Sequence, residues 1–210
     1  MIKTIFFDFD GVLTLDRTGN AVTAKHLSQI LKMPAEEVAI QWKKAYADLD
    51  ETGAPVEEAW ERLCKNLGVN LERSVLYDGF ASVRIDNRAL NLIKNLRQKY
   101  TVGLISDNNR ERYEFLDNKI GIAKHFDFTS VSCYVHATKS EPKIFEDALK
   151  KCGNKPEDCI FIDNKASNLE TAAKLGIKTI LYDLKFGKMF FSTSSFRSRM
   201  NNSNSYSGST

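Results

Sequence analysis

Near its amino terminus the chain reads TIFFDFDGVL, an apolar run that ends in two aspartates, Asp8 and Asp10, followed by Gly11. Two carboxylates this close resist ionising together unless a cation joins them. Because Mg²⁺ prefers oxygen ligands, the pair predicts a magnesium site at the end of a strand. These residues alone leave a second interpretation open, in which they form a polar turn and Gly11 supplies a backbone conformation that other residues avoid.

Three later residues hold comparable places at the ends of apolar runs or before helices. Ser106 ends the run TVGLIS and could bond a phosphate oxygen, or else cap the helix that follows. Lys139 could neutralise a phosphate, or else lie solvated at the surface. Asp163 ends the run CIFID and could hold a metal, or else cap a helix beginning near Ala166. Their shared order, at the same end of successive strands, favours one common site.

The elements that must position these residues alternate along the chain. Short apolar runs predict buried strands at Thr4 to Asp8, Tyr100 to Ser106, Phe128 to Cys133, Cys159 to Asp163 and Lys178 to Asp183. Apolar residues at helical spacing predict helices at Arg88 to Lys99, Asn109 to Lys119, Pro142 to Cys152 and Ala166 to Leu175. The alternation predicts an α/β fold, a Rossmann-like parallel sheet core with helices on both faces.

One interval breaks this alternation. From Thr18 to Arg84 there is only helical patterning, clearest at Ala35 to Ala47 and Val56 to Leu67. The predicted domains are therefore a catalytic core of residues 1–16 and 85–185 and an inserted α-helical cap of residues 17–84. We expect the cap over the carboxyl ends of the strands, where open α/β sheets bind ligands. Residues 186–210 form a Ser- and Asn-rich stretch without periodicity, which we expect to be a flexible tail.

The chain resembles the haloacid dehalogenase-like (HAD) hydrolase superfamily in four motifs. They are, in order, DFDGVL at Asp8 to Leu13, LIS at Leu104 to Ser106, KSEPKIF at Lys139 to Phe145 and FIDNKASNLETAAKLG at Phe161 to Gly176. The resemblance runs from about Ile2 to Asp183. The place of the helical insertion is similar to that in the helical-cap (C1 cap) phosphatase branch.

This resemblance implies a role for each matching residue. Asp8 would be the nucleophile that forms an aspartyl phosphate, and Asp10 would be the general acid and base. Ser106 and the backbone amide of Asp107 would orient the transferring phosphoryl group. Lys139 would neutralise part of the charge of that group.

The resemblance also implies a Mg²⁺ cofactor held by Asp8, by the backbone carbonyl of Asp10 and by the fourth motif. Where family members usually show two adjacent acids in that motif, this chain has Asp163 followed by Asn164. Either Asp163 binds the ion directly, or Asn164 binds the ion and Asp163 supports the site without contacting the ion. A neutral amide offers less charge than a carboxylate, so a weaker metal site than usual is expected.

Together these residues imply a Mg²⁺-dependent phosphatase acting on a small phosphomonoester. An acid at position 10 favours phosphate chemistry, because family members that remove halide lack it and have no leaving alcohol to protonate. Two alternatives stay open, namely a phosphomutase of a sugar phosphate and a non-catalytic phosphate-binding or interaction module. The expected partner is a small phosphorylated metabolite, an inference that rests on the family.

Composition excludes several other classes of protein. With 30 basic and 27 acidic residues among 210, the charge is nearly balanced, which argues against a nucleic-acid partner. No apolar stretch approaches the roughly 18 residues of a membrane span, and no signal peptide is evident, so we expect a cytoplasmic location without a membrane partner. The four cysteines lack metal-like spacing and are expected to be reduced packing residues. The sequence does not indicate an oligomeric state.

Overall fold

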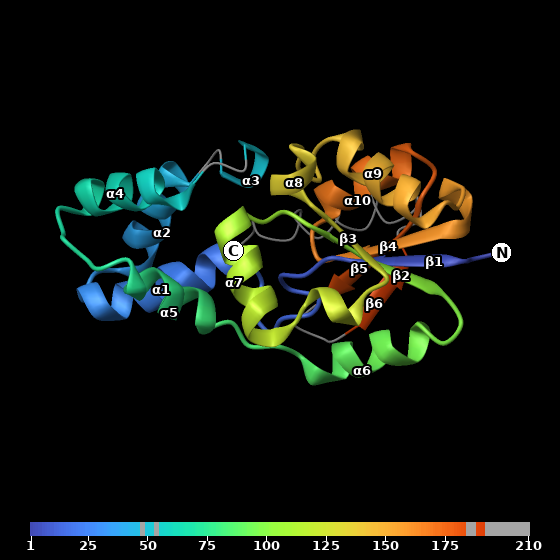
Figure 1. Ribbon diagram of the computed structural model, residues 1–210, viewed down its shortest axis with the longest axis horizontal. Coiled ribbons are helices and arrows are strands. Elements are labelled where there is room, and N and C mark those ends of the chain that lie inside the picture. Colours follow the sequence, from blue (N-terminus) through green and yellow to red (C-terminus); the bar gives the residue numbers. More distant parts are fainter. Residues whose placement is uncertain (47–48, 53–54, 184–187, 192–210) are drawn as a thin grey trace, which may run out of the picture.

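A computed structural model describes residues 1–46, 49–52, 55–183 and 188–191 of the chain. Its centre is a six-stranded sheet in the order β3-β2-β1-β4-β5-β6 (Figure 1). Neighbours from β3 to β5 pair in parallel, and β6 pairs antiparallel with β5. The strands are β1 (Thr4–Phe7), β2 (Thr101–Ser106), β3 (Phe128–Val131), β4 (Cys159–Asp163), β5 (Lys178–Asp183) and β6 (Lys188–Phe191).

Helices occupy both faces of the sheet and the interval after β1 (Figure 1). The interval holds α1 (Gly19–Leu31), α2 (Ala35–Ala45), α3 (Leu49–Thr52), α4 (Val56–Leu67) and α5 (Ser74–Ala81). The remaining helices are α6 (Asn87–Leu96), α7 (Arg110–Ile120), α8 (Ser132–Val135), α9 (Pro142–Cys152) and α10 (Ala166–Lys174), with short 3-10 turns at Ala123–His125 and Pro156–Asp158.

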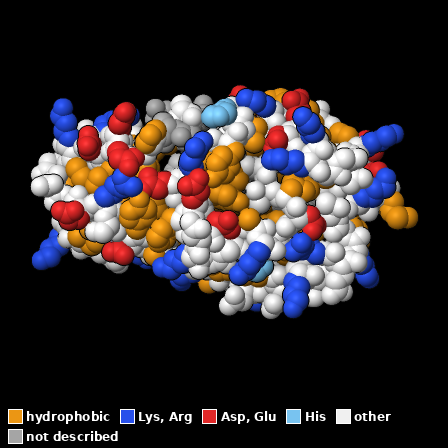
Figure 2. Space-filling view, in the orientation of Figure 1, with side chains coloured by type: hydrophobic (Ala, Val, Ile, Leu, Met, Phe, Trp, Pro, Cys, Tyr) orange, Lys and Arg blue, Asp and Glu red, His pale blue; other side chains and the backbone are white. Residues whose placement is uncertain are grey.

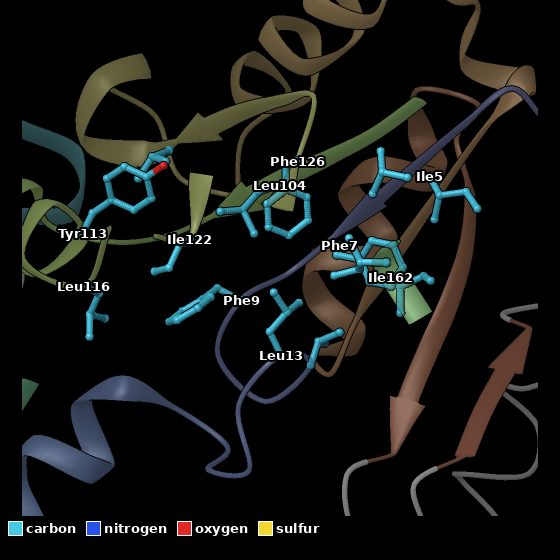
Figure 3. Close-up of a cluster of buried hydrophobic side chains, with 14 of the residues drawn as sticks. Ile5, Phe7, Phe9, Leu13, Leu104, Tyr113, Leu116, Ile122, Phe126 and Ile162 are labelled. Atoms are coloured by element: carbon cyan, nitrogen blue, oxygen red, sulfur yellow. The ribbon is translucent and has the colours of Figure 1, made fainter. Parts of the chain in front are cut away.

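The central strand β1 is buried on both sides because successive side chains of a strand point to opposite faces. Ile5 and Phe7 belong to one cluster with residues of α6 and α7, part of which Figure 3 shows. Phe6 belongs to a second cluster with residues of α9 and α10. The sheet therefore lies between two helical layers, each with its own apolar packing.

The helices α1 to α5 pack around a third cluster, which includes Trp42, Trp60 and Leu63. Thr18 begins α1 as its N-cap, and Gly68 ends α4 with a φ of 67°. These helices lie beyond the carboxyl end of β1 (Figure 1). No helix within the described ranges is both long and apolar enough to cross a bilayer.

Two chain segments join this helical unit to the sheet, and they pair with each other. Thr14 and Ile85 form an antiparallel bridge. The amide of Leu15 donates to the carbonyl of Arg84 at 2.8 Å, and the Arg84 side chain pairs with Asp16 at 2.8 Å. We call residues 13–16 and 84–86 the linker ribbon.

The predicted α/β fold class with a Rossmann-like parallel core is confirmed. The prediction of a strand to Cys133 is wrong at its end, because α8 begins at Ser132. Part of the stretch predicted to be a flexible tail, Lys188–Phe191, instead forms β6 beside β5. The rest of the predicted tail, residues 186–187 and 192–210, lies outside the described residues.

On the face shown in Figure 2, basic and acidic side chains are interspersed over both the helical unit and the sheet layer. No stripe of one charge runs across this face, as expected from the balanced composition.

Candidate active site

The candidate site lies where the chain order of the strands reverses around β1. Phe7 pairs with Leu104 of β2 on one side and with Ile162 of β4 on the other. Asp8 therefore leaves the sheet beside Asp163, and its amide donates to the carbonyl of Ile162 at 2.9 Å. Crevices at such reversal points are the usual ligand sites of open α/β sheets.

Phe9 separates the two aspartates and is itself a core residue. Its side chain is 1% exposed and lies near Leu13 and Ile122 (Figure 3). Because Phe9 is anchored in the core, Asp8 and Asp10 on either side of it are held at the end of the strand. The packing of Phe9 in the core thus fixes where the two charged side chains lie.

Lys139 joins Asp8 to Asp163. Its Nζ lies 2.6 Å from Oδ1 of Asp8 and donates to Oδ2 of Asp163 at 2.9 Å. Burial and the nearby charge of Asp163 raise the pKa of Asp8 to about 8, although Lys139 opposes this rise. Burial disfavours the charged form of Lys139, but the two carboxylates raise its pKa above the ordinary value, so it stays protonated.

Both carboxylate oxygens of Asp163 accept hydrogen bonds from neighbouring residues. In addition to Lys139, its carboxylate accepts from the Lys165 amide at 2.7 Å and from Nδ2 of Asn168 at 2.9 Å. It is 0% exposed, so it lies behind Lys139 rather than at the surface of the cleft. No side-chain cap bond forms at the start of α10.

The segment after β2 contributes through its backbone partners. The Asp107 carboxylate accepts from the amide of Lys139 at 2.8 Å and so fixes the loop that carries the lysine. Ser106 is 2% exposed at the end of β2 and does not cap α7, because Asn109 does. A role for Ser106 in phosphate binding stays a prediction.

Asp10 has a partner that the sequence analysis missed. Both of its carboxylate oxygens accept from the Arg112 guanidinium, Oδ2 from Nη1 and Oδ1 from Nη2, each at 2.9 Å. The Arg112 side chain is 5% exposed. Such a paired geometry fixes the orientation of a carboxylate as well as its charge environment.

Asn164 has the character expected of a cation ligand. Its Nδ2 donates to the carbonyl of Arg17 at 3.0 Å, while its buried Oδ1 has no hydrogen-bond partner among the described residues. A Cβ at Gly11 would lie 1.9 Å from that Nδ2, and Gly11 has a φ of 83°, so glycine is required there on both grounds. The residues present therefore fit a Mg²⁺ ion held by Asp8, the Asp10 carbonyl and Asn164.

Among the described residues no group of three or more His, Cys, Asp or Glu side chains could hold a metal ion by itself. The donor set just named contains an amide and a backbone carbonyl, which are oxygen ligands suited to Mg²⁺. The side-chain oxygen of the predicted ligand Asn164 has no hydrogen-bond partner among the described residues, whereas both carboxylate oxygens of Asp163 are already hydrogen-bonded. This favours Asn164 over Asp163 as the direct ligand.

Asp8, Asp10 and Lys139 line a cleft of about 110 Å³ between the end of the sheet and the start of α1. It is large enough for more than one water molecule and suits a small anion. Its lining is charged or polar, with Gly19 as the exception, and consists of Asp8, Asp10, Arg17, Thr18, Gly19, Asn20, Asp107, Asn108, Asn109, Arg112, Lys139 and Lys165.

Asn108 is a second residue that the sequence analysis missed. Its backbone amide donates to Oγ of Ser132 at 2.9 Å, and its backbone carbonyl accepts from the same hydroxyl at 3.2 Å. Its Nδ2 is buried without a partner in the described part of the chain. An unpaired donor beside an anion-sized cleft is suited to a phosphate oxygen. The only local signal was its place just after a strand end.

A family model described as haloacid dehalogenase-like hydrolase matches residues 2–176. The rat protein "Bifunctional epoxide hydrolase 2" is 25% identical over an alignment of 202 residues, which covers 86% of this chain and 36% of that protein. The chain thus spans about a third of the length of that relative. The "Glyceraldehyde 3-phosphate phosphatase" of Pyrococcus furiosus is 25% identical over 201 residues, covering 89% of this chain and 82% of that one.

Solved structures share the fold. A HAD family enzyme from Bacteroides thetaiotaomicron, in complex with magnesium and inorganic phosphate, has a TM-score of 0.73 at 23% identity, covering 93% of this chain and 99% of that one. L-2-haloacid dehalogenase from Xanthobacter autotrophicus has a TM-score of 0.65 at 17% identity, covering 85% and 76%. Structural likeness alone therefore does not separate phosphate chemistry from halide chemistry.

Proposed function

Because the chain belongs to the haloacid dehalogenase-like hydrolase family, we propose that it hydrolyses a small phosphomonoester through an aspartyl phosphate at Asp8, with Mg²⁺ as cofactor. Two kinds of relative support this proposal. One is named a glyceraldehyde 3-phosphate phosphatase, and the other is a structure that holds magnesium and inorganic phosphate.

The observation that carries the proposal is the pairing of two carboxylates with different surroundings at one cleft. Asp8 contacts Lys139, whereas Asp10 contacts Arg112. Two carboxylates held apart in this way suit different roles, one as nucleophile and one in proton transfer. A leaving halide needs no proton but a leaving alkoxide does, so the acid at position 10 favours phosphate esters over haloacids.

In the first half of the reaction, the Asp8 carboxylate attacks phosphorus and the bond from phosphorus to the leaving oxygen breaks. Oδ1 of Asp8 accepts from the Phe9 amide at 2.7 Å and contacts Lys139, and these two contacts orient the carboxylate for attack. Protonated Asp10 gives its proton to the leaving alkoxide. Lys139 and the side-chain amide of Asn108 hold phosphoryl oxygens while the charge shifts.

In the second half, the Asp10 carboxylate takes a proton from water, the water oxygen attacks phosphorus, and the bond to Asp8 breaks. Inorganic phosphate leaves, and both aspartates return to their starting states. Asp8, the Asp10 carbonyl and Asn164 would hold Mg²⁺, which would favour the ionised form of Asp8 and offset the charge of the phosphate. The cleft lining from α1, including Thr18 and Asn20, would limit water access and contact the rest of the substrate.

Phosphate release from p-nitrophenyl phosphate tests the proposal. We expect activity in Mg²⁺, loss of activity in EDTA, and recovery when Mg²⁺ is restored. Asp8→Asn should abolish release, since an amide cannot form the aspartyl phosphate. Asp158→Asn is the matched control, because Asp158 is a surface carboxylate paired with Lys3 away from the cleft.

The substrate is then sought among sugar phosphates, nucleotides, phosphoglycolate and lipid phosphates. Return of the phosphoryl group to another hydroxyl of a sugar phosphate would identify a mutase. Silence across the whole panel in Mg²⁺ would contradict the proposal and favour a binding module.

A further inference from the structure

The ion pair between Arg112 and Asp10 is the best-defined contact of the cleft whose function the reaction steps above do not use. Two parallel bonds of 2.9 Å join the guanidinium to the carboxylate, which commits both terminal nitrogens of Arg112. The remaining nitrogen, Nε, is buried and lacks a partner among the described residues. Arg112 also lines the cleft, and there both of its terminal nitrogens bond Asp10.

The guanidinium is confined by three parts of the chain. Its carbon lies 5.8 Å from the centre of the Phe9 ring, and its backbone amide donates to the Asn109 side chain at 2.9 Å. Against its far side lies Gly19, at the start of α1, where a Cβ would come within 2.2 Å of Nη2. Only glycine at this position leaves the guanidinium its place.

A second cation already serves the phosphate end of the cleft. Lys139 lies 2.6 Å from Asp8 and is bound to that side of the site. Arg112 instead holds the carboxylate that the proposed function assigns to proton transfer. Orientation of an acid or base to within a few tenths of an ångström decides how well it transfers a proton.

We propose that Arg112 is a positioning residue for Asp10, fixing the carboxylate that protonates the leaving oxygen and later activates water. The inference rests on the proposed function and deepens it. Gly19 supports the same contact, because its lack of a side chain leaves the space that the guanidinium occupies. Arg112 therefore acts on proton transfer rather than on phosphate binding.

Leaving-group dependence separates these two roles. The anion p-nitrophenolate is stable and departs without a proton, whereas the alkoxide of glycerol phosphate requires one. General acids contribute about 10²- to 10⁴-fold to such reactions. Loss of positioning should therefore slow alkyl phosphates much more than p-nitrophenyl phosphate, while loss of a phosphate-binding cation should slow both alike.

The experiment measures kcat/KM for glycerol 3-phosphate and p-nitrophenyl phosphate in the full chain with Mg²⁺. For Arg112→Gln we expect a loss on the alkyl ester at least about tenfold greater than on the aryl ester, with a smaller selective loss for Arg112→Lys. Gly19→Ala should show the same selectivity, although it keeps the charge. Arg110→Gln, on the same helix, is the control and should leave both substrates unchanged.

Coupling between the two residues gives an independent readout. Asp10→Asn should show the same alkyl-selective loss, and Arg112→Gln combined with Asp10→Asn should add no further selectivity. Equal losses on both esters in variants with wild-type circular dichroism, or multiplicative losses in the double variant, would overturn the inference. Wild-type protein silent on both esters and on the whole substrate panel would instead overturn the proposed function, and this inference with it.

Discussion

Part of the site could be predicted from local sequence. Asp8, Lys139 and Asp163 were predicted from their places beside apolar runs and helix starts, and the structure brings them within ion-pair distance. Arg112 could not be predicted in this way, because its partner Asp10 is 102 positions away. An arginine in the first turn of a polar helix carries no local sign of that contact.

Asn164 offers a direct test at the residue scale. Asn164→Asp places a charged oxygen at the candidate ligand position, so the Mg²⁺ concentration for half-maximal activity should fall by roughly tenfold. The variant also loses the bond from Nδ2 to the Arg17 carbonyl, so lower stability without Mg²⁺ is expected. The measurement is a Mg²⁺ titration of phosphate release.

Asn118→Asp controls for the added charge, because Asn118 is exposed on α7. An unchanged Mg²⁺ requirement in Asn164→Asp would contradict the assignment of Asn164 as a direct ligand.

At the scale of elements, α7 links the sheet to the helical unit. Its Glu111 bonds both Arg73, at 2.7 Å, and Tyr77 of α5, while Arg73 also pairs with Glu57 of α4. Phe115, one turn further along, packs against both the sheet cluster and the cluster of α1 to α5, with its ring 5.4 Å from that of Tyr77. The helix α7, which carries Arg112, therefore also contacts the helical unit and holds it against the sheet layer.

Phe115→Ala should weaken the packing between α7 and the helical unit. Because Phe115 is only partly buried, we expect a loss of about 1–3 kcal/mol in the free energy of unfolding, less than for a core phenylalanine. Hydrogen exchange should rise selectively in α5, whose contact with α7 is weakened, and in α1, which packs against α5. Exchange that rises equally in the strands of the sheet would count against this interpretation.

The neighbouring Leu116→Ala gives the comparison. Leu116 is 0% exposed in the sheet cluster alone, so its loss should cost about 2–5 kcal/mol and should not single out α1 and α5.

Elements differ in how well local sequence predicts them. The bounds of β4, β5, α4 and α9 match the prediction, because each has a clear apolar pattern between turn signals. The residues Ser132 to Cys133 favour a strand locally, but the Ser132 hydroxyl bonds the backbone of Asn108 where α8 begins. That contact between distant segments is not visible in the local pattern.

At the scale of the whole molecule, the linker ribbon joins two packed units. Asp86 lies at its base, where its amide donates to the carbonyl of Leu13 at 2.8 Å. Its carboxylate is the N-cap of α6, accepting from the Arg88 amide at 2.9 Å and from the Arg88 guanidinium at 2.8 Å. Asp86 thus ends the linker ribbon and is also the N-cap of α6, the helix that follows.

The Asp86→Ala variant should lower the free energy of unfolding at neutral pH by about 1 kcal/mol, as for other lost N-caps. For a chain of this size that is a fall in Tm of about 2–4 °C. Asn87→Ala, at the next position of α6, is the control and should change Tm little, because Asn87 is not the cap.

The pH dependence of this loss follows from the pKa of Asp86. Hydrogen bonds from the Arg88 side chain and backbone hold that pKa below its ordinary value of 3.8. The folded protein therefore binds a proton there less readily than the unfolded chain does, so the contribution is complete above about pH 4 and is lost as the pH falls through the folded pKa. The Tm difference between wild type and Asp86→Ala should be constant from pH 5 to 8 and shrink near pH 3. A difference that stays the same at pH 3 would show that the charge of Asp86 does not contribute, because only the ionised carboxylate accepts both bonds from Arg88 at full strength.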